Sequence, residues 1–187
     1  INDIIKILKE AYKKNWITPR DGNVSYKLSG SDKFIITPSG QRKQELKKSD
    51  FIDVEISGNG WKQLNNFDKK PSGEIELHYE ILKHIKKDIC IIHLHPTAII
   101  SAMFAGFNLS TLSKSFPELG RYTKVAFNTE NVPPLSKDLA IQCMANLKFD
   151  SKQEKFRNDI VGIPNHGIVS IGKNAYDAFE HVERLEH

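Results

Sequence analysis

Two histidines that could bind a metal ion stand in an apolar stretch, the segment Ile91-Ile92-His93-Leu94-His95-Pro96. Side chains in a β-strand alternate between its two faces, so His93 and His95 are expected to point the same way. Two imidazoles side by side in an apolar strand cost free energy unless something binds them, and a divalent metal ion is the usual partner. A bare His-x-His pair is weak evidence by itself, so a metal site requires further ligands.

Two other segments supply such ligands. Pro71-Ser72-Gly73-Glu74 lies upstream and contributes a carboxylate, and Asn165-His166-Gly167 lies far downstream and contributes a third imidazole. Both segments have the composition of turns. Three histidines, one carboxylate and an open coordination position make up the ligand set of a catalytic zinc site. The sequence therefore predicts a zinc centre.

Three corners that combine glycine with a small polar side chain are suited to an anion. Each begins or ends a regular element and offers backbone N–H groups; they are Gly22-Asn23, Ser39-Gly40 and Ser72-Gly73. A phosphate suits Ser72-Gly73 best, because a helix N-terminus there adds the positive end of its dipole. Any one corner alone is most simply an ordinary turn. Neither Gly-x-x-x-x-Gly-Lys nor Gly-x-Gly-x-x-Gly occurs, so a nucleotide-binding loop is not expected.

Glu74 and the remaining histidines also have simpler interpretations. A carboxylate at the start of a helix often only complements the helix dipole, and Glu74 gains significance from Ser72 and the histidines around it. His78 falls on the same helical face one turn later, where packing beside the site is favoured over a role as ligand. The other histidines lack supporting context and are expected to be exposed; they are His84, His181 and His187.

Size and composition predict one compact domain over residues 1–187. The chain is 39% hydrophobic and has a formal net charge of +4, which suits a globular protein with a substantial core. Its lysines are dispersed; the one basic cluster, residues 41–48, is interrupted by Glu45 and contains no aromatic side chain for stacking on bases. A solvated face is therefore favoured over a nucleic-acid surface, although the positive charge could attract a small anionic substrate.

Cysteine usage and hydropathy indicate a cytoplasmic protein. Cys90 and Cys143 are far apart in apolar surroundings and are expected to be buried, reduced thiols. We expect no signal peptide. The longest apolar stretch, residues 89–107, is interrupted by two histidines and Pro96, so no membrane span is expected.

The candidate residues lie among intermixed helices and strands, and the sequence contains no internal repeats. Asn59-Gly60 is expected to form a hairpin turn, and Ser72 to cap a helix. The predicted helices span residues 1–15, 73–86 and 136–148, with two more opening at Pro96 and Asn174. The predicted strands span residues 24–28, 34–37, 51–57, 60–64, 88–95, 124–128, 159–163 and 167–171. This mixture predicts a layered α/β domain whose sheet is partly antiparallel.

In this order, the segments resemble the class II aldolase/adducin family, in particular its fuculose-phosphate aldolases. The resemblance covers nearly the whole chain and implies a three-layer αβα sandwich with a central, mainly antiparallel sheet. It also implies a homo-oligomer, usually a cyclic tetramer with active sites between subunits. The motifs that carry it are Gly22-Asn23-Val24-Ser25, Ile36-Thr37-Pro38-Ser39-Gly40, Pro71-Ser72-Gly73-Glu74 with His78, His93-Leu94-His95, Asn165-His166-Gly167 and a Glu-rich closing helix.

The resemblance further implies a role for each site residue. One Zn²⁺ per subunit would be bound by His93, His95 and His166, with Glu74 nearby as acid/base and as a ligand when substrate is absent. The residues implied to hold the substrate phosphate are Gly22, Asn23, Ser39, Gly40, Ser72 and Gly73.

Chemistry and resemblance agree on a zinc-dependent aldolase acting on a phosphorylated sugar. Zinc would polarise the carbonyl of a ketose 1-phosphate and stabilise the enediolate left when a C–C bond breaks, giving dihydroxyacetone phosphate and an aldehyde. Glu74 would move a proton on and off that carbanion, a role favoured by burial and opposed by the charge of the metal.

Two departures from the fuculose enzymes bear on this assignment. Those enzymes have a second serine where this chain has Gly73, so one phosphate-binding hydroxyl is missing. Their catalytic tyrosine follows the His-x-His pair, and the corresponding segment here, residues 112–118, contains no tyrosine. Glu118 instead lies roughly where methylthioribulose-phosphate dehydratases carry a glutamate, and it could act on a hydroxyl leaving group as a second catalytic residue.

Three alternatives therefore stay open beside the aldolase. A methylthioribulose-1-phosphate dehydratase-like activity would give a dehydrated diketone as product. An epimerase is disfavoured, because those of this family carry aspartate at the position of Glu74. A non-catalytic, adducin-like assembly domain would be expected to have lost metal ligands that this chain retains. The sequence does not identify the sugar.

Overall fold

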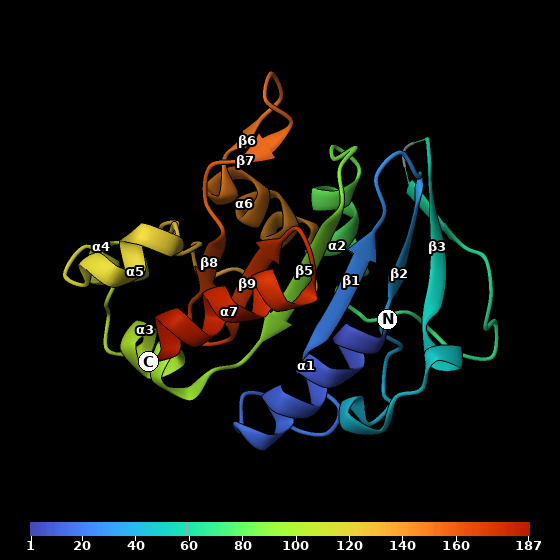
Figure 1. Cartoon of the computed structure of the whole chain (residues 1–187), viewed down its shortest axis with the longest axis horizontal. Helices are drawn as coiled ribbons and strands as arrows, with labels where there is room; N and C mark the ends of the chain where they lie inside the picture. Colours follow the sequence, from blue (N-terminus) through green and yellow to red (C-terminus); the bar gives the residue numbers. More distant parts are fainter. Residues whose placement is uncertain (59) are drawn as a thin grey trace.

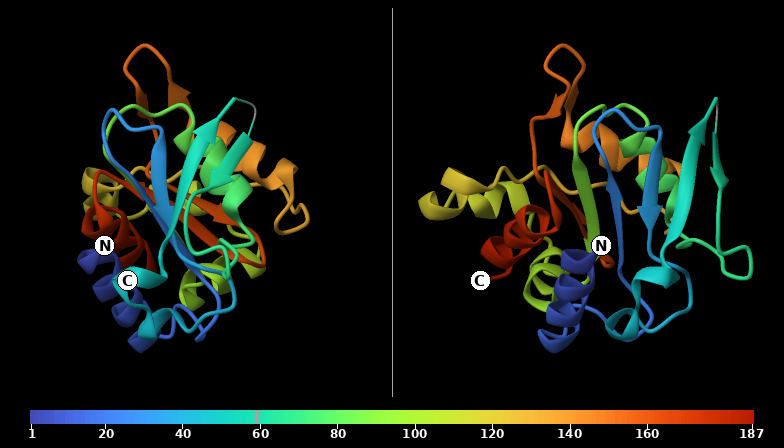
Figure 2. Two further views of the ribbon diagram at one scale, coloured as in Figure 1. Left: turned by 90° about the vertical axis from the view of Figure 1, so that its right-hand side faces the viewer. Right: turned by 45° about the vertical axis from the view of Figure 1, so that its right-hand side comes forward.

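A seven-stranded sheet forms the centre of the computed structural model, which describes residues 1–58 and 60–187 (Figures 1 and 2). The strand order is β4-β3-β2-β1-β5-β9-β8, and each of these neighbours pairs in the antiparallel sense. The strands are β1 (Asn23–Lys27), β2 (Lys33–Ile36), β3 (Ile52–Ser57), β4 (Gly60–Gln63), β5 (Ile89–Leu94), β8 (Ile160–Ile163) and β9 (Gly167–Gly172).

Helices cover both faces of this sheet. In Figure 1, α1 (Asn2–Lys13) and α7 (Ala175–Glu186) cross in front of it, whereas α2 (Ile75–Leu82) and α6 (Lys137–Leu147) lie behind. The predicted αβα sandwich with a mainly antiparallel sheet is thus confirmed. The remaining helical elements are α3 (Thr97–Phe104), α4 (Leu109–Ser113), α5 (Pro117–Tyr122) and two short 3₁₀ turns, η1 (Lys43–Glu45) and η2 (Lys48–Asp50).

Alternation along β5 divides the core between the two faces. Ile92 and its even-numbered neighbours pack with α1 and α7, and Ile91 packs with α2 and α6. Burying each such aliphatic side chain contributes about 1.5–3 kcal/mol before the entropy of ordering is subtracted. By the same alternation His93 shares the α2 face with Ile91, so the strand itself aims the first predicted ligand toward Glu74.

The structure corrects several predicted elements. Helix α2 is shorter than expected and begins at Ile75 with Glu74 at the N-cap, while Ser72 Oγ accepts a hydrogen bond from the Glu74 backbone N–H at 3.3 Å. Residues 124–128, predicted as a strand, contribute an isolated bridge at Val125. Asn59 of the predicted hairpin turn lies outside the described residues. The structure adds elements that were not predicted: α4, α5 and a small ribbon of β6 (Phe149–Asp150) and β7 (Lys155–Phe156).

Both cysteines agree with the sequence prediction. Cys90 and Cys143 are free thiols, and burial raises the pKa of each well above its usual value, so both stay protonated and unreactive. Across residues 1–58 and 60–187, every helix is too short or too polar to cross a membrane.

Candidate metal centre

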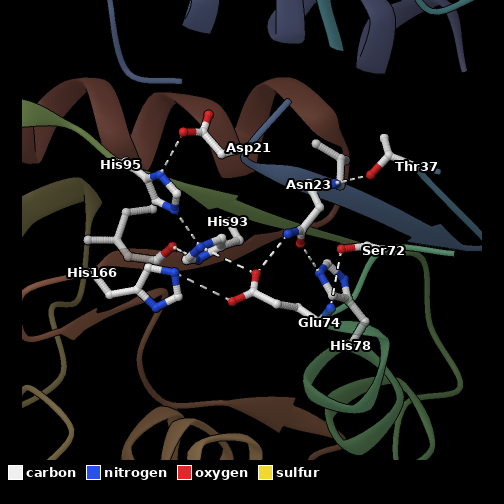
Figure 3. A network of polar contacts seen from close by, with 11 residues as sticks. Asp21, Asn23, Thr37, Ser72, Glu74, His78, His93, His95 and His166 are labelled. Carbon is white, nitrogen blue, oxygen red and sulfur yellow. Dashed lines mark hydrogen bonds and ion pairs between the residues drawn. The ribbon is translucent and has the colours of Figure 1, made fainter. Parts of the chain in front are cut away.

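The three predicted histidines meet at the end of β5 (Figure 3). One ring nitrogen from each of His93, His95 and His166 lies within 4.8 Å of the other two. The ring centroid of His93 lies 4.7 Å from the centroid of His95 and 4.7 Å from that of His166. The centroids of His95 and His166 are 5.1 Å apart. Residues separated by more than seventy positions in the sequence therefore form one cluster.

The Asn-His-Gly segment places His166 through a tight turn between β8 and β9. Asn165 has φ of +58°, a left-handed conformation that asparagine tolerates better than most residues. Gly167 allows β9 to approach β5 closely, because an added Cβ would lie 2.3 Å from Leu94 O and 2.7 Å from His95 Cδ2. Local geometry thus explains the asparagine and the glycine on either side of His166.

Two of the histidines have their rings oriented by a polar partner. His93 Nδ1 lies 2.9 Å from Ile168 O and must donate to it, which leaves the lone pair of Nε2 facing the cluster. His95 Nδ1 lies 3.4 Å from Asp21 Oδ2, and its Nε2 lies 2.8 Å from His93 Nε2. Partners of this kind hold the rings of metal-binding histidines and set their tautomers. Asp21 was not predicted, and only its position before Gly22 in the chain could have suggested it.

Glu74 completes the cluster from the N-cap of α2, where it is 5% exposed. Its Oε2 accepts a hydrogen bond from Asn23 Nδ2 at 2.7 Å and lies 3.3 Å from His93 Nε2. Its Oε1 lies 3.7 Å from His166 Nε2 and has no hydrogen-bond partner among the described residues. A buried carboxylate oxygen left unpaired is costly, and a cation in front of it would remove that cost. The donor set therefore fits a divalent metal such as zinc.

The protonation states also suit a metal. Burial lowers the pKa of His93 and of His166, and it lowers the pKa of His95 to about 4. All three imidazoles are consequently neutral near pH 7, which is the form that binds metal ions. Burial acts to raise the pKa of Glu74, but the positive charge of His93 and its neighbouring histidines when they are protonated, together with the hydrogen bond from Asn23, outweighs burial, so that pKa falls below its usual value. Glu74 is thus a buried, ionised carboxylate.

A pocket of about 350 Å³ opens beside the histidines and Glu74. Backbone hydrogen bonds hold two of its corners together, from Ser39 N to Lys70 O at 2.9 Å and from Ser72 N to Thr37 O at 3.0 Å. The amide of Asn23 is engaged by Glu74 and His78 instead of facing a ligand. All six residues predicted from the corners line the pocket: Gly22, Asn23, Ser39, Gly40, Ser72 and Gly73.

Lys43 also lines this pocket, which corrects the prediction of a solvated basic face at this position; Arg42, Lys47 and Lys48 of the same segment are exposed as predicted. It is 2% exposed, and its Nζ donates to Arg20 O at 3.2 Å and to Gln41 O at 3.0 Å. Burial lowers the pKa of Lys43 to about 8, so most of the amine is charged at pH 7. The pattern of charges around Lys43 gave no signal of this burial; only its nearness to Ser39-Gly40 could have suggested it.

Two other predicted features lie elsewhere. Glu118 is exposed on α5 and lines a second, largely apolar pocket of about 670 Å³ with residues of α3, α4 and α7. The fold of one chain therefore does not bring Glu118 to the histidine cluster, and its catalytic role stays a prediction. His181, expected to be exposed, is 6% exposed and has its Nδ1 2.8 Å from Thr123 Oγ1.

Comparisons with known proteins agree with this geometry. The sequence model of the family described as "Class II Aldolase and Adducin N-terminal domain" matches residues 2–187. The chain is 30% identical to the L-fuculose phosphate aldolase of Methanocaldococcus jannaschii, over 97% of this chain and 89% of that protein. It is 28% identical to a methylthioribulose-1-phosphate dehydratase of Bacillus mycoides, over 98% and 84%. A solved L-fuculose 1-phosphate aldolase superposes with a TM-score of 0.76 at 25% identity, covering 99% of this chain and 80% of the other.

Proposed function

Since this chain belongs to the class II aldolase and adducin family, we propose that it is a zinc-dependent aldolase that cleaves a ketose 1-phosphate to dihydroxyacetone phosphate and an aldehyde. Its named relatives of similar length are a sugar-phosphate aldolase and a sugar-phosphate dehydratase, which are both lyases. We further propose that residues 1–187 act as one catalytic domain. The free, buried Cys90 and Cys143 support a cytoplasmic location.

One observation carries this proposal: the histidine cluster, Glu74 and the three glycine corners open onto the same pocket. In a ketose 1-phosphate, the phosphate is one carbon away from the carbonyl. A substrate with its phosphate at the corners therefore has its carbonyl close to the metal ligands. Lys43 supports this orientation, because it supplies a positive charge where the corners offer only neutral N–H and O–H donors.

In the proposed reaction, the metal ion and the residues of the chain have separate roles. Zinc bound by His93, His95 and His166 would supply a Lewis acid that polarises the carbonyl and stabilises the enediolate. Glu74 would move the proton on the carbon that loses or regains its bond, using Oε1, which lies beside the ligands and has no hydrogen-bond partner within residues 1–58 and 60–187. The corners would fix the phosphate and thereby keep the reacting carbon in the pocket that Glu74 lines.

The test is a screen of ketose 1-phosphates with coupled detection of dihydroxyacetone phosphate, using zinc-loaded protein and its Glu74→Gln variant. We expect Glu74→Gln to retain zinc on the three histidines and to lose most turnover, because glutamine cannot accept the proton. Elemental analysis of both proteins provides the control. Near-wild-type turnover in Glu74→Gln would remove Glu74 from the catalytic role, and protein purified with well below one equivalent of metal would favour the non-catalytic, adducin-like alternative.

A dehydratase is the second candidate. It is favoured by the 28% identity to the methylthioribulose-1-phosphate dehydratase and by the presence of Glu118. The two reactions differ in product, since the dehydratase would release water and leave a diketone phosphate instead of two fragments. Incubation of the zinc-loaded protein with methylthioribulose 1-phosphate, followed by mass spectrometry, distinguishes them by a loss of 18 mass units without fragmentation.

A further inference from the structure

We propose that His78 is a positioning residue, which fixes the amide of Asn23 and through it the carboxylate of Glu74. This inference rests on the proposed role of Glu74 in proton transfer. It concerns a buried row of side chains: Ser25 and Asn23 from β1, His78 from α2 and Glu74 from the N-cap of α2. Figure 3 shows Asn23, His78 and Glu74 of this row. Ser25 and Asn23 share a strand face, and Glu74 and His78 are one helical turn apart, so the two elements hold the row between them.

The contacts form a continuous chain. His78 Nδ1 lies 2.6 Å from Ser25 Oγ, and its Nε2 lies within hydrogen-bonding distance of Asn23 Oδ1. Asn23 Nδ2 then donates to Glu74 Oε2 at 2.7 Å. Ser25 and His78 are 0% exposed and Asn23 is 5% exposed, so water does not compete for these contacts.

Donor and acceptor rules allow one arrangement of protons. A carboxylate only accepts, so Asn23 must turn its NH₂ group toward Glu74 and its carbonyl oxygen toward His78. His78 must then donate from Nε2, and because a neutral imidazole carries one N–H, Nδ1 must accept from the hydroxyl of Ser25. Burial lowers the pKa of His78 to about 3, which keeps the ring neutral. Each group thus donates to the next, from Ser25 to Glu74.

As a consequence, the two carboxylate oxygens of Glu74 have different roles. Asn23 donates to Oε2, while Oε1 lies beside His166 and accepts no hydrogen bond from the part of the chain that the structure describes. Without the N–H of His78, the amide of Asn23 could turn its oxygen toward the carboxylate, and the two oxygens would repel each other. His78 lies behind Asn23 instead of lining the pocket, so it acts through Asn23 and not on the substrate.

Two substitutions at this position separate positioning from simple core packing. His78→Phe keeps a ring of similar volume without nitrogen, whereas His78→Gln keeps an N–H donor near the position of Nε2. For the zinc-loaded enzyme we expect His78→Phe to lower kcat by about 10- to 100-fold, the effect of one strong hydrogen bond, with KM changed less than about threefold. His78→Gln should recover most of the lost kcat. Zinc content should stay at that of the wild type in both.

His181→Phe is the matched control, because His181 is also buried and hydrogen-bonded but lies on α7 beside Thr123. It should keep wild-type kcat. A double-mutant cycle adds Asn23→Ala: since His78 acts through Asn23, His78→Phe should reduce kcat little further in that background. Equal loss in His78→Phe and His78→Gln, full additivity with Asn23→Ala, or a loss that follows zinc content would overturn the proposal.

A second measurement does not depend on catalysis. NMR of ¹⁵N-histidine-labelled, metal-free protein identifies the tautomer of His78, which we expect to be the Nε2–H form at pH 7. Finding the Nδ1–H form would overturn the proposed order of hydrogen bonds, whatever reaction the protein catalyses. If the Nε2–H form is found but no ketose phosphate is cleaved or dehydrated by the wild type, the proposed function fails while the order of hydrogen bonds is supported.

Discussion

Three of the four predicted ligand side chains are held by a polar partner before any ion binds. Ile168 O orients His93, Asp21 lies beside His95, and Asn23 holds Glu74. Such partners reduce the reorganisation needed when a metal binds and aim the ligand atoms at one point. Hydrogen-bonded core histidines such as His181 also have a polar partner, so the cluster is distinguished by the convergence of three ring nitrogens on one point.

Lys43 allows a direct test of the phosphate corners. Lys43→Met keeps the length of the buried side chain but removes its charge, so we expect KM for a phosphorylated ketose to rise about 10- to 100-fold with kcat and zinc content nearly unchanged. Steady-state kinetics measure this change. Lys48→Met, on the same basic segment but exposed, is the control and should behave as the wild type. An unchanged KM in Lys43→Met would place the phosphate elsewhere.

The site residues that could be predicted are those whose local sequence shows a recognisable pattern. His93 and His95 followed from strand alternation, and His166 and Glu74 from turn motifs that share glycine with small polar residues. The inward positions of Asp21 and Lys43 depend on contacts with distant elements, which no local pattern of charge or hydropathy records. For the same reason His181, on a polar-looking stretch of helix, was wrongly predicted to be exposed.

At the scale of elements, the approach of β9 to β5 decides the position of the ligands. Gly167→Ala would force its Cβ against Leu94 O and the ring of His95. We expect zinc affinity to fall at least about 10-fold and the free energy of unfolding to fall by about 1–3 kcal/mol. Competition with a chromophoric chelator and urea unfolding measure the two effects.

Gly120→Ala in α5 is the matched control for that change. An added Cβ there meets no atom of the described residues within 4 Å, and alanine favours a helix by up to about 1 kcal/mol relative to glycine. Zinc affinity should therefore be unchanged and stability equal or slightly higher. If Gly167→Ala behaved in the same way, the close approach of the two strands would not govern the site.

The elements that were predicted well are those with a strong local pattern. The apolar run of β5 and the caps of α6 at Ser136 and of α7 at Asn174 agree with the structure, and both cap side chains accept the expected backbone hydrogen bond. Helices α4 and α5 are only five and six residues long and have too few turns to show a periodic stripe. Residues 124–128 were predicted as a strand because their centre, Val125-Ala126-Phe127, is apolar, but they bridge β8 at a single position.

At the scale of the whole molecule, Glu118 and Glu74 line separate pockets of one chain. A catalytic Glu118 would therefore have to serve the site of a neighbouring copy, as in the homotetramer proposed from the family. Mixing inactive Glu74→Gln protein with Glu118→Gln protein after dissociation should then restore up to about one quarter of the wild-type sites, because some interfaces would combine two intact residues. Activity assays and light scattering of the mixture test this; no recovery in a reassembled oligomer would remove Glu118 from the site.

The buried histidines also make the stability of the whole metal-free fold depend on pH. The pKa of His78 is lowered to about 3 and that of His95 to about 4, whereas histidine in the unfolded chain titrates near 6.5. As pH falls below 6.5 the unfolded chain takes up protons that the folded chain cannot, so stability present above pH 6.5 is lost. At pH 5 each of these two residues should reduce the free energy of unfolding by about 2 kcal/mol.

Urea unfolding of chelator-treated protein between pH 7.5 and 5 measures this loss. His78→Phe removes one of the two groups and should show a shallower decline over the same range. If the free energy of unfolding of the wild type did not change with pH, the buried imidazoles of His78 and His95 would be protonated in the folded state more easily than their burial indicates.

Strand β5 lies in the interior of the sheet, between β1 and β9. Substitutions at the metal ligands and substitutions at the rim of the pocket should therefore have different effects. The histidine cluster is built on an interior strand, so substitutions there are expected to disturb the packing of the sheet. Turn residues at the rim of the same pocket, such as Pro134 and Leu135, can be exchanged to change which substrate fits without altering the metal ligands. One scaffold can in this way keep its metal site while its specificity changes.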